Sequence, residues 1–276
     1  MRLTLVIASL AGGGAERVMA TLGDRWLAEG HEVTLVTLYP DSHDVMGIAA
    51  GVSRVVVGAA DAGAGRLRRA QLALGRLIRL RRVIEESRPE VVVSFMTKTN
   101  ILTLLAMRGT GVPVIVSERI DPRCHRVGPM VRVLRHFEYR RAARVVVQSS
   151  AVQQWAGSFL NPDRVVRIAN PVSVRPTAVV TGRAADGVAT GVDARPMVVA
   201  MGRLVSQKGF DVLITAFARL APEFPEWRLV IAGEGEERER LRRLAEREGV
   251  ADHVEMPGWV ESPSELLLAA DLFVLS

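Results

Sequence analysis

Two cations, Arg203 and Lys208, lie in one short segment whose surroundings favour phosphate binding. The segment reads M-G-R-L-V-S-Q-K-G over residues 201–209, between an apolar run at 197–200 and a helical pattern that begins at Phe210. It is therefore expected to be a strand-to-helix turn. The first amides of a helix have no partner within the helix, and the helix dipole adds partial positive charge there. Two cationic side chains beside that end would hold a phosphate or a diphosphate.

Lysine is rare in this chain, so a lysine in that turn is informative. Only Lys98 and Lys208 occur among the 36 Lys and Arg residues. From charge alone, a solvated turn with two surface cations is the alternative interpretation.

The elements around this turn follow from the alternation of apolar runs with helical patterns. Strands are expected at 3–8, 31–38, 52–57, 90–95, 112–117, 144–148, 164–168, 197–200, 227–232, 253–256 and 271–276. Helices are expected at 15–29, 65–87, 130–143, 210–220, 236–248 and 264–270. Buried strands that alternate with helices predict doubly wound parallel sheets, and hence the α/β fold class.

The alternation stops once, which predicts two domains in the 276 residues. Residues 173–195 lack clear periodicity and are expected to be a linker, between a first domain at 1–172 and a second at 196–276. The net charge of +6 favours anionic partners. The single cysteine, Cys124, excludes an internal disulfide and a cysteine metal cluster, and a reducing compartment is expected. No apolar run reaches the roughly 18–20 residues of a membrane span.

A glycine turn, Gly12-Gly13-Gly14, follows the first strand. The dinucleotide fingerprint G-x-G-x-x-G would need a third glycine where the chain has Arg17, which weakens a dinucleotide oxidoreductase interpretation. Three glycines instead allow another molecule to approach the backbone closely, and a plain tight turn is the alternative.

Two polar segments, 94–100 and 117–122, follow neighbouring predicted strands. Ligands in open α/β sheets bind beyond the carboxyl ends of strands, so both segments are expected to face one crevice. Within the second, Glu118 and Arg119 could equally form a local ion pair.

The helix expected at 65–87 is amphipathic. Its predicted inner face comprises Leu67, Ala70, Ala73, Leu74, Leu77, Leu80 and Ile84. Its predicted outer face comprises Arg68, Arg69, Arg76, Arg79 and Arg82, with Leu72 and Val83. A solvated charged face is one interpretation, and docking on an anionic membrane is the other.

Several motifs together resemble family 4 of the retaining glycosyltransferases. They are L-A-G-G-G-A-E-R-V after the first strand, V-S-E-R-I-D-P at 116–122, N-P-V at 170–172, G-R-L-V-S-Q-K-G-F-D at 202–211 and V-I-A-G-E-G at 230–235. The resemblance spans the whole chain in order. It implies a GT-B architecture of two doubly wound (Rossmann-like) parallel-sheet domains with a nucleotide-sugar between them. The S-E-R-x-D-P form is most similar to bacterial enzymes that extend lipid-linked or surface glycans from UDP-sugars.

The resemblance also implies roles for individual residues. The implied catalytic residues are Arg203 and Lys208, which would bind the donor diphosphate, and Glu118, which would lie near the sugar or acceptor. The implied nucleotide-sugar-binding residues are Gly13, Gly14, Gly202, Trp259 and Val260, together with Arg203 and Lys208.

The implied reaction is metal-independent transfer of a hexose or N-acetylhexosamine from a UDP-sugar to an acceptor hydroxyl, with retention of configuration. The departing phosphate would take the acceptor proton, so no protein nucleophile and no cofactor are expected. The family carries two glutamates, seven residues apart, just after the strand that here ends at Ser276. The second domain is therefore expected to be incomplete and the chain alone inactive.

The expected partners are a nucleotide-sugar, a glycan or lipid-linked acceptor and an anionic membrane surface, with no nucleic acid. The expected location is cytoplasmic, peripheral on the inner face of the cell membrane. Three alternatives stay open: a nucleotide-sugar epimerase on the same fold, a non-catalytic module that binds nucleotide-sugar or anionic lipid, and the weakened oxidoreductase.

Overall fold

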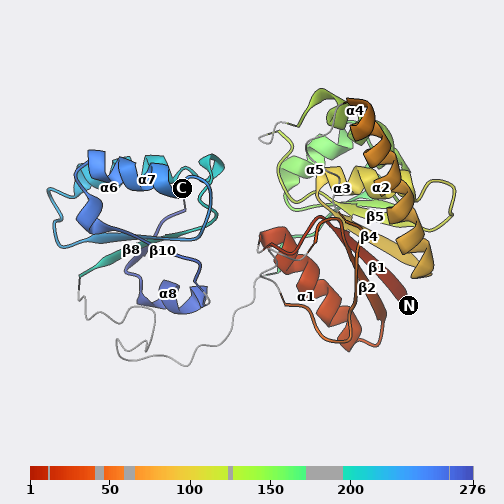
Figure 1. Ribbon diagram of the computed structural model, residues 1–276, viewed down its shortest axis with the longest axis horizontal. Coiled ribbons are helices and arrows are strands. Elements are labelled where there is room, and N and C mark those ends of the chain that lie inside the picture. The colour runs from red at the N-terminus through yellow and green to blue at the C-terminus, as the bar shows by residue number, and fades with distance from the viewer. Residues whose placement is uncertain are drawn as a thin grey trace. The chain divides into compact units, whose positions relative to one another are not determined.

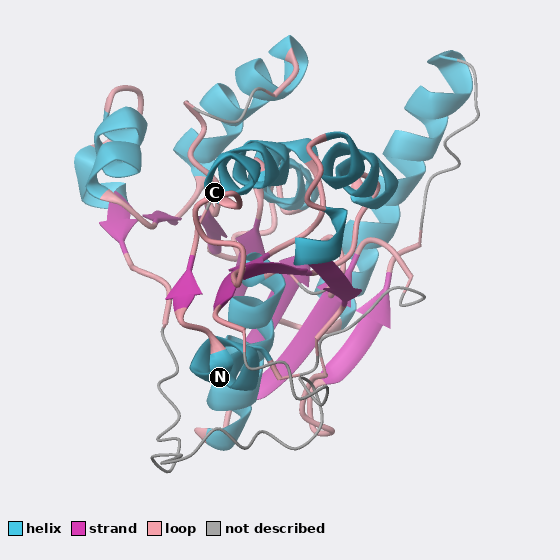
Figure 2. Ribbon diagram, turned by 90° about the vertical axis from the view of Figure 1, so that its left-hand side faces the viewer, coloured by secondary structure: helices cyan, strands magenta, loops and turns pink. Residues whose placement is uncertain are grey.

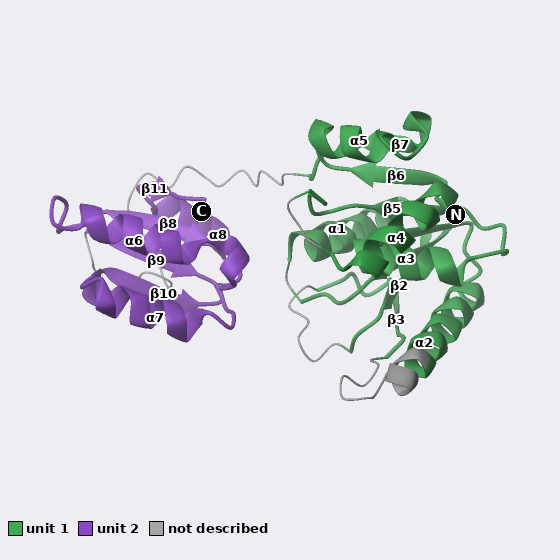
Figure 3. Ribbon diagram, turned by 90° about the horizontal axis from the view of Figure 1, so that it is seen from above, with its two compact units in different colours: residues 1–173 green, residues 174–276 purple. Residues whose placement is uncertain are grey.

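The structure of the protein is a computed structural model that describes residues 1–11, 13–40, 47–58, 66–123, 127–171, 195–260 and 262–275. It divides the chain into two compact units, Met1–Ser173 and Val174–Ser276 (Figure 3). The predicted linker at 173–195 lies outside the described residues except for Arg195, so it stays a prediction. No helix in the described ranges is long and apolar enough to cross a membrane.

The first unit is built on a seven-stranded parallel sheet (magenta arrows in Figure 2). Its strands are β1 Arg2–Ile7, β2 Glu32–Thr37, β3 Ser53–Val56, β4 Val91–Phe95, β5 Val114–Ser117, β6 Arg144–Val147 and β7 Val165–Arg167. Their order across the sheet is β3-β2-β1-β4-β5-β6-β7. The predicted parallel α/β sheet of this domain is confirmed.

Helices cover both faces of this sheet. They are α1 Gly14–Ala28, α2 Arg66–Glu86, α3 Thr97–Ala106, α4 Pro129–Glu138 and α5 Ser150–Gly157, with short 3-10 turns η1 Tyr139–Arg141 and η2 Pro162–Arg164. Successive side chains of a strand point to opposite faces. In β1, Leu5 joins a buried cluster with Met19 of α1, whereas Val6 joins a second cluster with Leu80 of α2.

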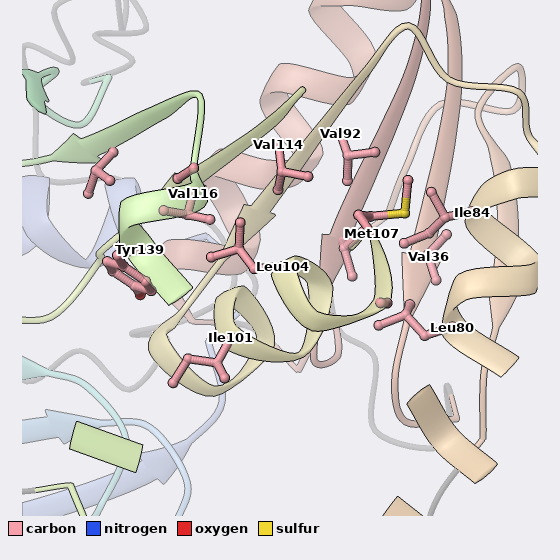
Figure 4. Packing of buried hydrophobic residues seen from close by; sticks show 14 of the residues in the cluster. Val36, Leu80, Ile84, Val92, Ile101, Leu104, Met107, Val114, Val116 and Tyr139 are labelled. Atoms are coloured by element: carbon pink, nitrogen blue, oxygen red, sulfur yellow. The ribbon is translucent and has the colours of Figure 1, made fainter. Parts of the chain in front are cut away.

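The second cluster is the larger and ties α2, α3, α4 and α5 to the strands; Figure 4 shows part of it. Leu80 and Ile84 come from α2, Ile101 and Leu104 from α3, and Tyr139 follows α4. The two helices α3 and α5 were not predicted from the sequence. Residues 97–100, which were expected to lie in a polar loop, form the first turn of α3.

The predicted faces of α2 are partly wrong. Leu80 and Ile84 are buried as expected, but Leu74 is 58% exposed. Ile78, one helical turn further on, is 59% exposed. Conversely, Val83, which was expected to face outward, packs against the larger cluster. The cause is that the large cluster reaches only the second half of the helix. Leu67, Ala70, Arg68 and Arg69 lie outside the described side chains.

The second unit is built on a four-stranded parallel sheet (Figure 1), whose strand order is β10-β9-β8-β11 (Figure 3). Its strands are β8 Met197–Met201, β9 Arg228–Ala232, β10 Val254–Gly258 and β11 Leu272–Phe273. Its helices are α6 Phe210–Leu220, α7 Arg238–Arg247 and α8 Pro263–Ala269, with 3-10 turns η3 Ser206–Lys208 and η4 Ala251–His253. The helices α6 and α7 share one buried cluster, and Leu266 of α8 belongs to the other. The alternation predicted for this domain is therefore confirmed.

Candidate functional site

The crevice of the first unit lies where its strand order reverses, between β1 and β4. Strands β2 and β3 follow β1 to one side, and β4 to β7 lie to the other. In open α/β sheets such a switch point leaves a crevice at the carboxyl ends of the strands. A pocket of about 550 Å³ occupies this place, and we call it the crevice pocket. It is lined by Ile7, Ala8, Glu16, Leu38, Tyr39, Leu72, Ala73, Arg76, Met96, Thr97, Lys98, Thr99, Leu102, Glu118, Ile120 and Val127.

The glycine turn borders this pocket through the start of α1. Gly12 lies outside the described residues. Gly13 precedes the helix in an extended conformation, with φ −85° and ψ 172°, so its backbone does not require glycine. Gly14 opens the helix, and a Cβ built on it would meet no atom within 4 Å. The open space beside Gly14 is compatible with the predicted close approach of another molecule.

Glu118 is a buried carboxyl in the wall of the crevice pocket. It directly follows β5, and only 2% of the residue is exposed. The hydroxyl of Tyr139 donates a hydrogen bond of 2.6 Å to its Oε1. The hydroxyl of Thr97 lies 3.0 Å from Oε1 and 2.9 Å from Oε2. Two elements, α3 before Glu118 in the chain and η1 after it, thus hold this carboxyl at the crevice.

Burial raises the pKa of Glu118 above its ordinary 4.5. The hydrogen bonds from Tyr139 and Thr97 and the charge of Arg135 lower that pKa, but the loss of hydration outweighs them. The pKa of Tyr139 is itself raised well above 10.0, mainly by burial, so its hydroxyl keeps its proton and donates. Glu118 is therefore a carboxyl whose protonation is more easily reached than that of a solvated glutamate.

Arg119 does not pair with Glu118. Its guanidinium carbon lies 4.6 Å from the centroid of the Phe95 ring, and it donates a hydrogen bond to Asn170 of the N-P-V motif. The local ion pair that the sequence left open between Glu118 and Arg119 is therefore wrong. Burial lowers the pKa of Arg119 from 12.5.

The sequence did not single out Thr97 or Tyr139, although both bind Glu118. Lys98, by contrast, was noticed as one of two lysines and lies in the pocket wall, in the first turn of α3. Arg76 of α2 was expected on an outer face, but it also lines the pocket, with its guanidinium 5.3 Å from the centroid of the Tyr39 ring. An apolar run at 101–107 was the available signal for α3.

The sheet of the second unit also has a switch point. The strands β9 and β10 extend from β8 to one side, and β11 pairs with β8 on the other, so the order reverses at β8. Gly202, Arg203 and Lys208 follow β8 directly. All three therefore lie at the carboxyl end of the strand where the order reverses.

Main-chain hydrogen bonds tie the loops at this edge together. The amide of Gly202 donates to Ala232 at 3.0 Å, and the amide of Leu204 donates to Glu234 at 2.9 Å. The amide of Gly233 donates to Gly258 at 2.7 Å, which joins the end of β10 to the others. Main-chain hydrogen bonds thus connect three segments at this edge of the sheet: the loop after β8, the loop after β9 and the end of β10.

The position of Gly233 requires glycine. Its φ is +142°, and a Cβ placed there would lie 1.9 Å from the carbonyl oxygen of Gly202. Real side chains do not tolerate such an approach, so the loops can pack this closely only around a residue without Cβ. Gly233, the first residue of the G-E-G segment at 233–235, thereby allows this loop to pack against the turn that carries the two cations.

The turn that carries Arg203 and Lys208 is held in the core by Leu204, which lies between them in the sequence. Leu204 is fully buried, whereas Arg203 beside it is exposed. Lys208 ends η3, and Gly209, in the left-handed conformation with φ +66°, is the N-cap residue of α6. The Lys208 side chain also lies over Gly202, 3.4 Å from where a Cβ would be. The predicted strand-to-helix turn is thus present, with both cations beside the start of a helix.

Trp259 and Val260 follow β10 at the same edge. Trp259 is 48% exposed, whereas Val260 packs in the cluster with Val199 and Val230. No three His, Cys, Asp or Glu side chains in the described ranges lie close enough to hold a metal ion. The implied role of the 259–260 backbone, and transfer without a metal, stay predictions.

Two family models match the chain. The model described as "Glycosyl transferase 4-like domain" matches residues 13–171, which is more than half of the chain. The model described as "Glycosyl transferases group 1" matches residues 188–276.

Two characterised bacterial relatives differ in how much of the chain they match. A Campylobacter jejuni protein named "GalNAc-alpha-(1->4)-GalNAc-alpha-(1->3)-diNAcBac-PP-undecaprenol alpha-1,4-N-acetyl-D-galactosaminyltransferase" is 25% identical over 279 aligned residues, 100% of this chain and 72% of that protein. The lipopolysaccharide core biosynthesis glycosyltransferase LpsE of Rhizobium meliloti is 44% identical over 81 residues. That second match covers 29% of this chain and only 23% of LpsE.

Solved structures share the fold. Anabaena Alr3699/HepE in complex with UDP has a TM-score of 0.71 at 15% identity, over 100% of this chain and 74% of that one. Sucrose-phosphate synthase from Thermosynechococcus elongatus has a TM-score of 0.79 at 14% identity, over 100% of this chain and 75% of that one. The predicted GT-B fold, with two doubly wound parallel-sheet domains, is confirmed.

Proposed function

Because the chain belongs to the glycosyltransferase 4-like family, we propose that it transfers a sugar from a nucleotide-sugar, a UDP-sugar in particular, to an acceptor hydroxyl with retention of configuration. The observation that carries this proposal is the turn at 202–209, in which Arg203 and Lys208 lie between the carboxyl end of β8 and the start of α6. UDP as the donor nucleotide is supported by its presence in the related Anabaena structure.

The chemical task of this turn is to stabilise the leaving group. As the bond between sugar and phosphate breaks, negative charge grows on the diphosphate. A guanidinium, an ammonium and the unpaired amides at the start of α6 oppose that charge. The main chain that carries the two cations is held before the reaction by the buried Leu204 and by its amide hydrogen bond to Glu234, so little main-chain rearrangement is needed.

The acceptor side is proposed to be the crevice pocket of the first unit. Glu118 has a raised pKa and can accept a hydrogen bond from a sugar or acceptor hydroxyl when ionised, or donate one when protonated. Lys98 supplies a cation in the same wall, which would suit a phosphate of a lipid-linked acceptor. In this proposal the departing phosphate takes the acceptor proton, and no protein nucleophile is assigned.

A lipid-linked acceptor makes docking on an anionic membrane useful. Exposed apolar residues come from two helices, Leu74 and Ile78 of α2 and Met130, Val133 and Phe137 of α4. Both helices pack beside α3. The only acid in α4 is the buried Glu138, and the exposed Arg132 and Arg140 lie beside its apolar stripe. Apolar residues flanked by cations suit a surface of anionic lipid.

The test is to incubate the chain with a panel of UDP-sugars and a lipid-linked glycan, and to measure free UDP and glycosylated product together. Sugar transfer requires both products in equal amounts. An epimerase would convert the UDP-sugar without releasing UDP. Binding of UDP without release or product would contradict sugar transfer by residues 1–276 alone, and is the result that either the expected inactivity of this chain or the non-catalytic module would give.

A further inference from the structure

A second pocket of the first unit lies at the opposite end of its strands from the crevice pocket. Its volume is about 420 Å³. Val114 begins β5, Arg144 begins β6, and Arg164 directly precedes β7. Arg108, which follows α3, and Arg141, which ends η1, complete its charged wall. We call it the arginine pocket after these four arginines.

The charges in the arginine pocket are poorly balanced. None of the described residues that line it is acidic. The nearest carboxylate partner is Glu138, a buried residue that forms an ion pair with Arg108 and lies 3.9 Å from Arg141. One carboxylate therefore pairs with two of the four guanidinium groups, and among the described residues Arg144 and Arg164 have no carboxylate partner. Gathering like charges in this way is unfavourable unless an anion joins them.

Two of the arginines are held in place without being neutralised. Arg144 donates to the carbonyl of Ala143 at 2.8 Å, and Arg164 donates to the carbonyl of Arg140 at 2.9 Å. These bonds to neutral acceptors fix each guanidinium group while leaving its charge and its remaining N–H groups.

The remaining wall strengthens the field of these cations. Leu104, Val114 and Ala142 are buried and apolar, and the first two are labelled in Figure 4. Charges beside apolar walls are screened less than charges in open water. A planar guanidinium binds two oxygens of a phosphate at once, so several around one hollow match a phosphate well.

We propose that the arginine pocket binds a phosphate group, carried either by a soluble phosphorylated molecule or by a phospholipid headgroup. The site goes beyond the proposed sugar transfer, because it lies at the amino ends of strands whose carboxyl ends form the crevice. Both sources present the same chemistry, and the experiment separates them.

The first measurement is calorimetric titration of inorganic phosphate at constant ionic strength. The protein carries Arg203→Ala and Lys208→Ala throughout, which removes the expected diphosphate site from the heat signal. Any phosphate bound near Lys98 in the crevice pocket contributes equally to every variant compared. The test pair is Arg144→Gln with Arg164→Gln, since their hydrogen bonds are to exposed main-chain groups and the partners of Glu138 stay in place.

The matched control pair is Arg25→Gln with Arg242→Gln. Both are exposed arginines in surface ion pairs, so the control removes the same charge elsewhere. We expect the test pair to weaken phosphate binding by roughly tenfold or more, and the control pair to change it by less than about twofold. Equal phosphate affinity in the two pairs would overturn the proposal.

A second variant guards against a folding defect. The pair Arg144→Lys with Arg164→Lys keeps both charges but loses the two-oxygen geometry, and thermal melts confirm that each variant folds. We expect its phosphate affinity to lie between those of the native pair and the glutamine pair. An affinity no higher than that of the glutamine pair, in a folded protein, would contradict a site built on charge.

The second measurement is binding to vesicles of phosphatidylglycerol and of phosphatidylcholine. If the phosphate is a lipid headgroup, the test pair lowers binding to phosphatidylglycerol vesicles more than the control pair does. If it belongs to a soluble molecule, only the calorimetric affinity falls. A calorimetric affinity that does not fall overturns the proposal for both sources.

Discussion

The hydroxyl of Tyr139 donates a hydrogen bond of 2.6 Å to the carboxyl of Glu118, across 21 positions of sequence. The same hydroxyl accepts a hydrogen bond of 2.9 Å from the side-chain amide of Asn100, and that amide also donates to the carbonyl of Ser117. A buried chain of hydrogen bonds thus connects α3, β5 and η1 behind the crevice pocket.

Replacing Tyr139 with Phe should therefore destabilise the first unit. The substitution keeps the ring but leaves the amide of Asn100 and the carboxyl of Glu118 each short of a partner, at a cost of about 1–3 kcal/mol in unfolding free energy. Urea denaturation measures it. The control is Tyr39→Phe, because that tyrosine is 43% exposed and its hydroxyl can bond to water. A loss no larger than that of the control would contradict a structural role for the hydrogen bond.

The raised pKa of Glu118 predicts how stability depends on pH. As pH rises from 4.5, the carboxyl ionises in the unfolded chain before it ionises in the folded one. The contribution of this carboxyl to the free energy of unfolding is therefore fully present below pH 4.5, and it is lost as the pH rises through the pKa of the folded state. Glu118→Gln removes the ionisation and keeps the shape.

We expect Glu118→Gln to unfold at a higher temperature than the native chain at neutral pH, with a smaller difference near pH 4. Thermal melts at several pH values from about 4 to 8 measure the difference. A constant difference across that range would show that burial does not raise this pKa.

Replacing Gly233 with Ala should damage the second unit. The new Cβ would lie 1.9 Å from the carbonyl of Gly202, so the loops that carry Arg203 must move. A cost of about 1–3 kcal/mol in stability is expected, together with weaker UDP binding. Gly75→Ala is the matched control, because it lies inside α2 with no atom within 4 Å of the new Cβ. That control should stabilise the helix by about 0.4–1 kcal/mol. A change of the same sign in the unfolding free energy of both variants would contradict the prediction.

More of the fold than of the candidate site could be predicted from the sequence. Every predicted strand is found, since buried strands read as short apolar runs bounded by turn residues. The inner face of α2 was wrong because helical spacing shows an apolar stripe but not where the sheet beneath it ends. The bond between Tyr139 and Glu118 depends on tertiary packing, and nothing in the spacing of those two residues indicates it. The turn with Arg203 and Lys208 was found because the apolar strand, the two cations and the helical pattern that indicate it are neighbours in the sequence.

Membrane docking is predicted to depend on the exposed stripe of α4. Met130→Ser with Phe137→Ser should reduce co-sedimentation with vesicles that contain phosphatidylglycerol, and high salt should reduce it further. Leu74→Ser with Ile78→Ser tests α2 in the same way. Val212→Ser is the control, because that residue is 70% exposed on α6 of the second unit. Binding that ignores salt and lipid charge would count against docking.

The most direct test of the proposed function is calorimetric titration of UDP into the native chain, into Lys208→Ala and into the control Arg242→Ala. Arg242 lies on α7 and is a surface cation paired with Glu239. Loss of one charge-assisted contact to the diphosphate should cost about 1.5–3 kcal/mol, which is on the order of 10- to 100-fold in Kd. We predict that Lys208→Ala shows this loss and that Arg242→Ala binds UDP like the native chain. Equal UDP affinity in all three proteins would contradict the assignment of this turn as the donor diphosphate site.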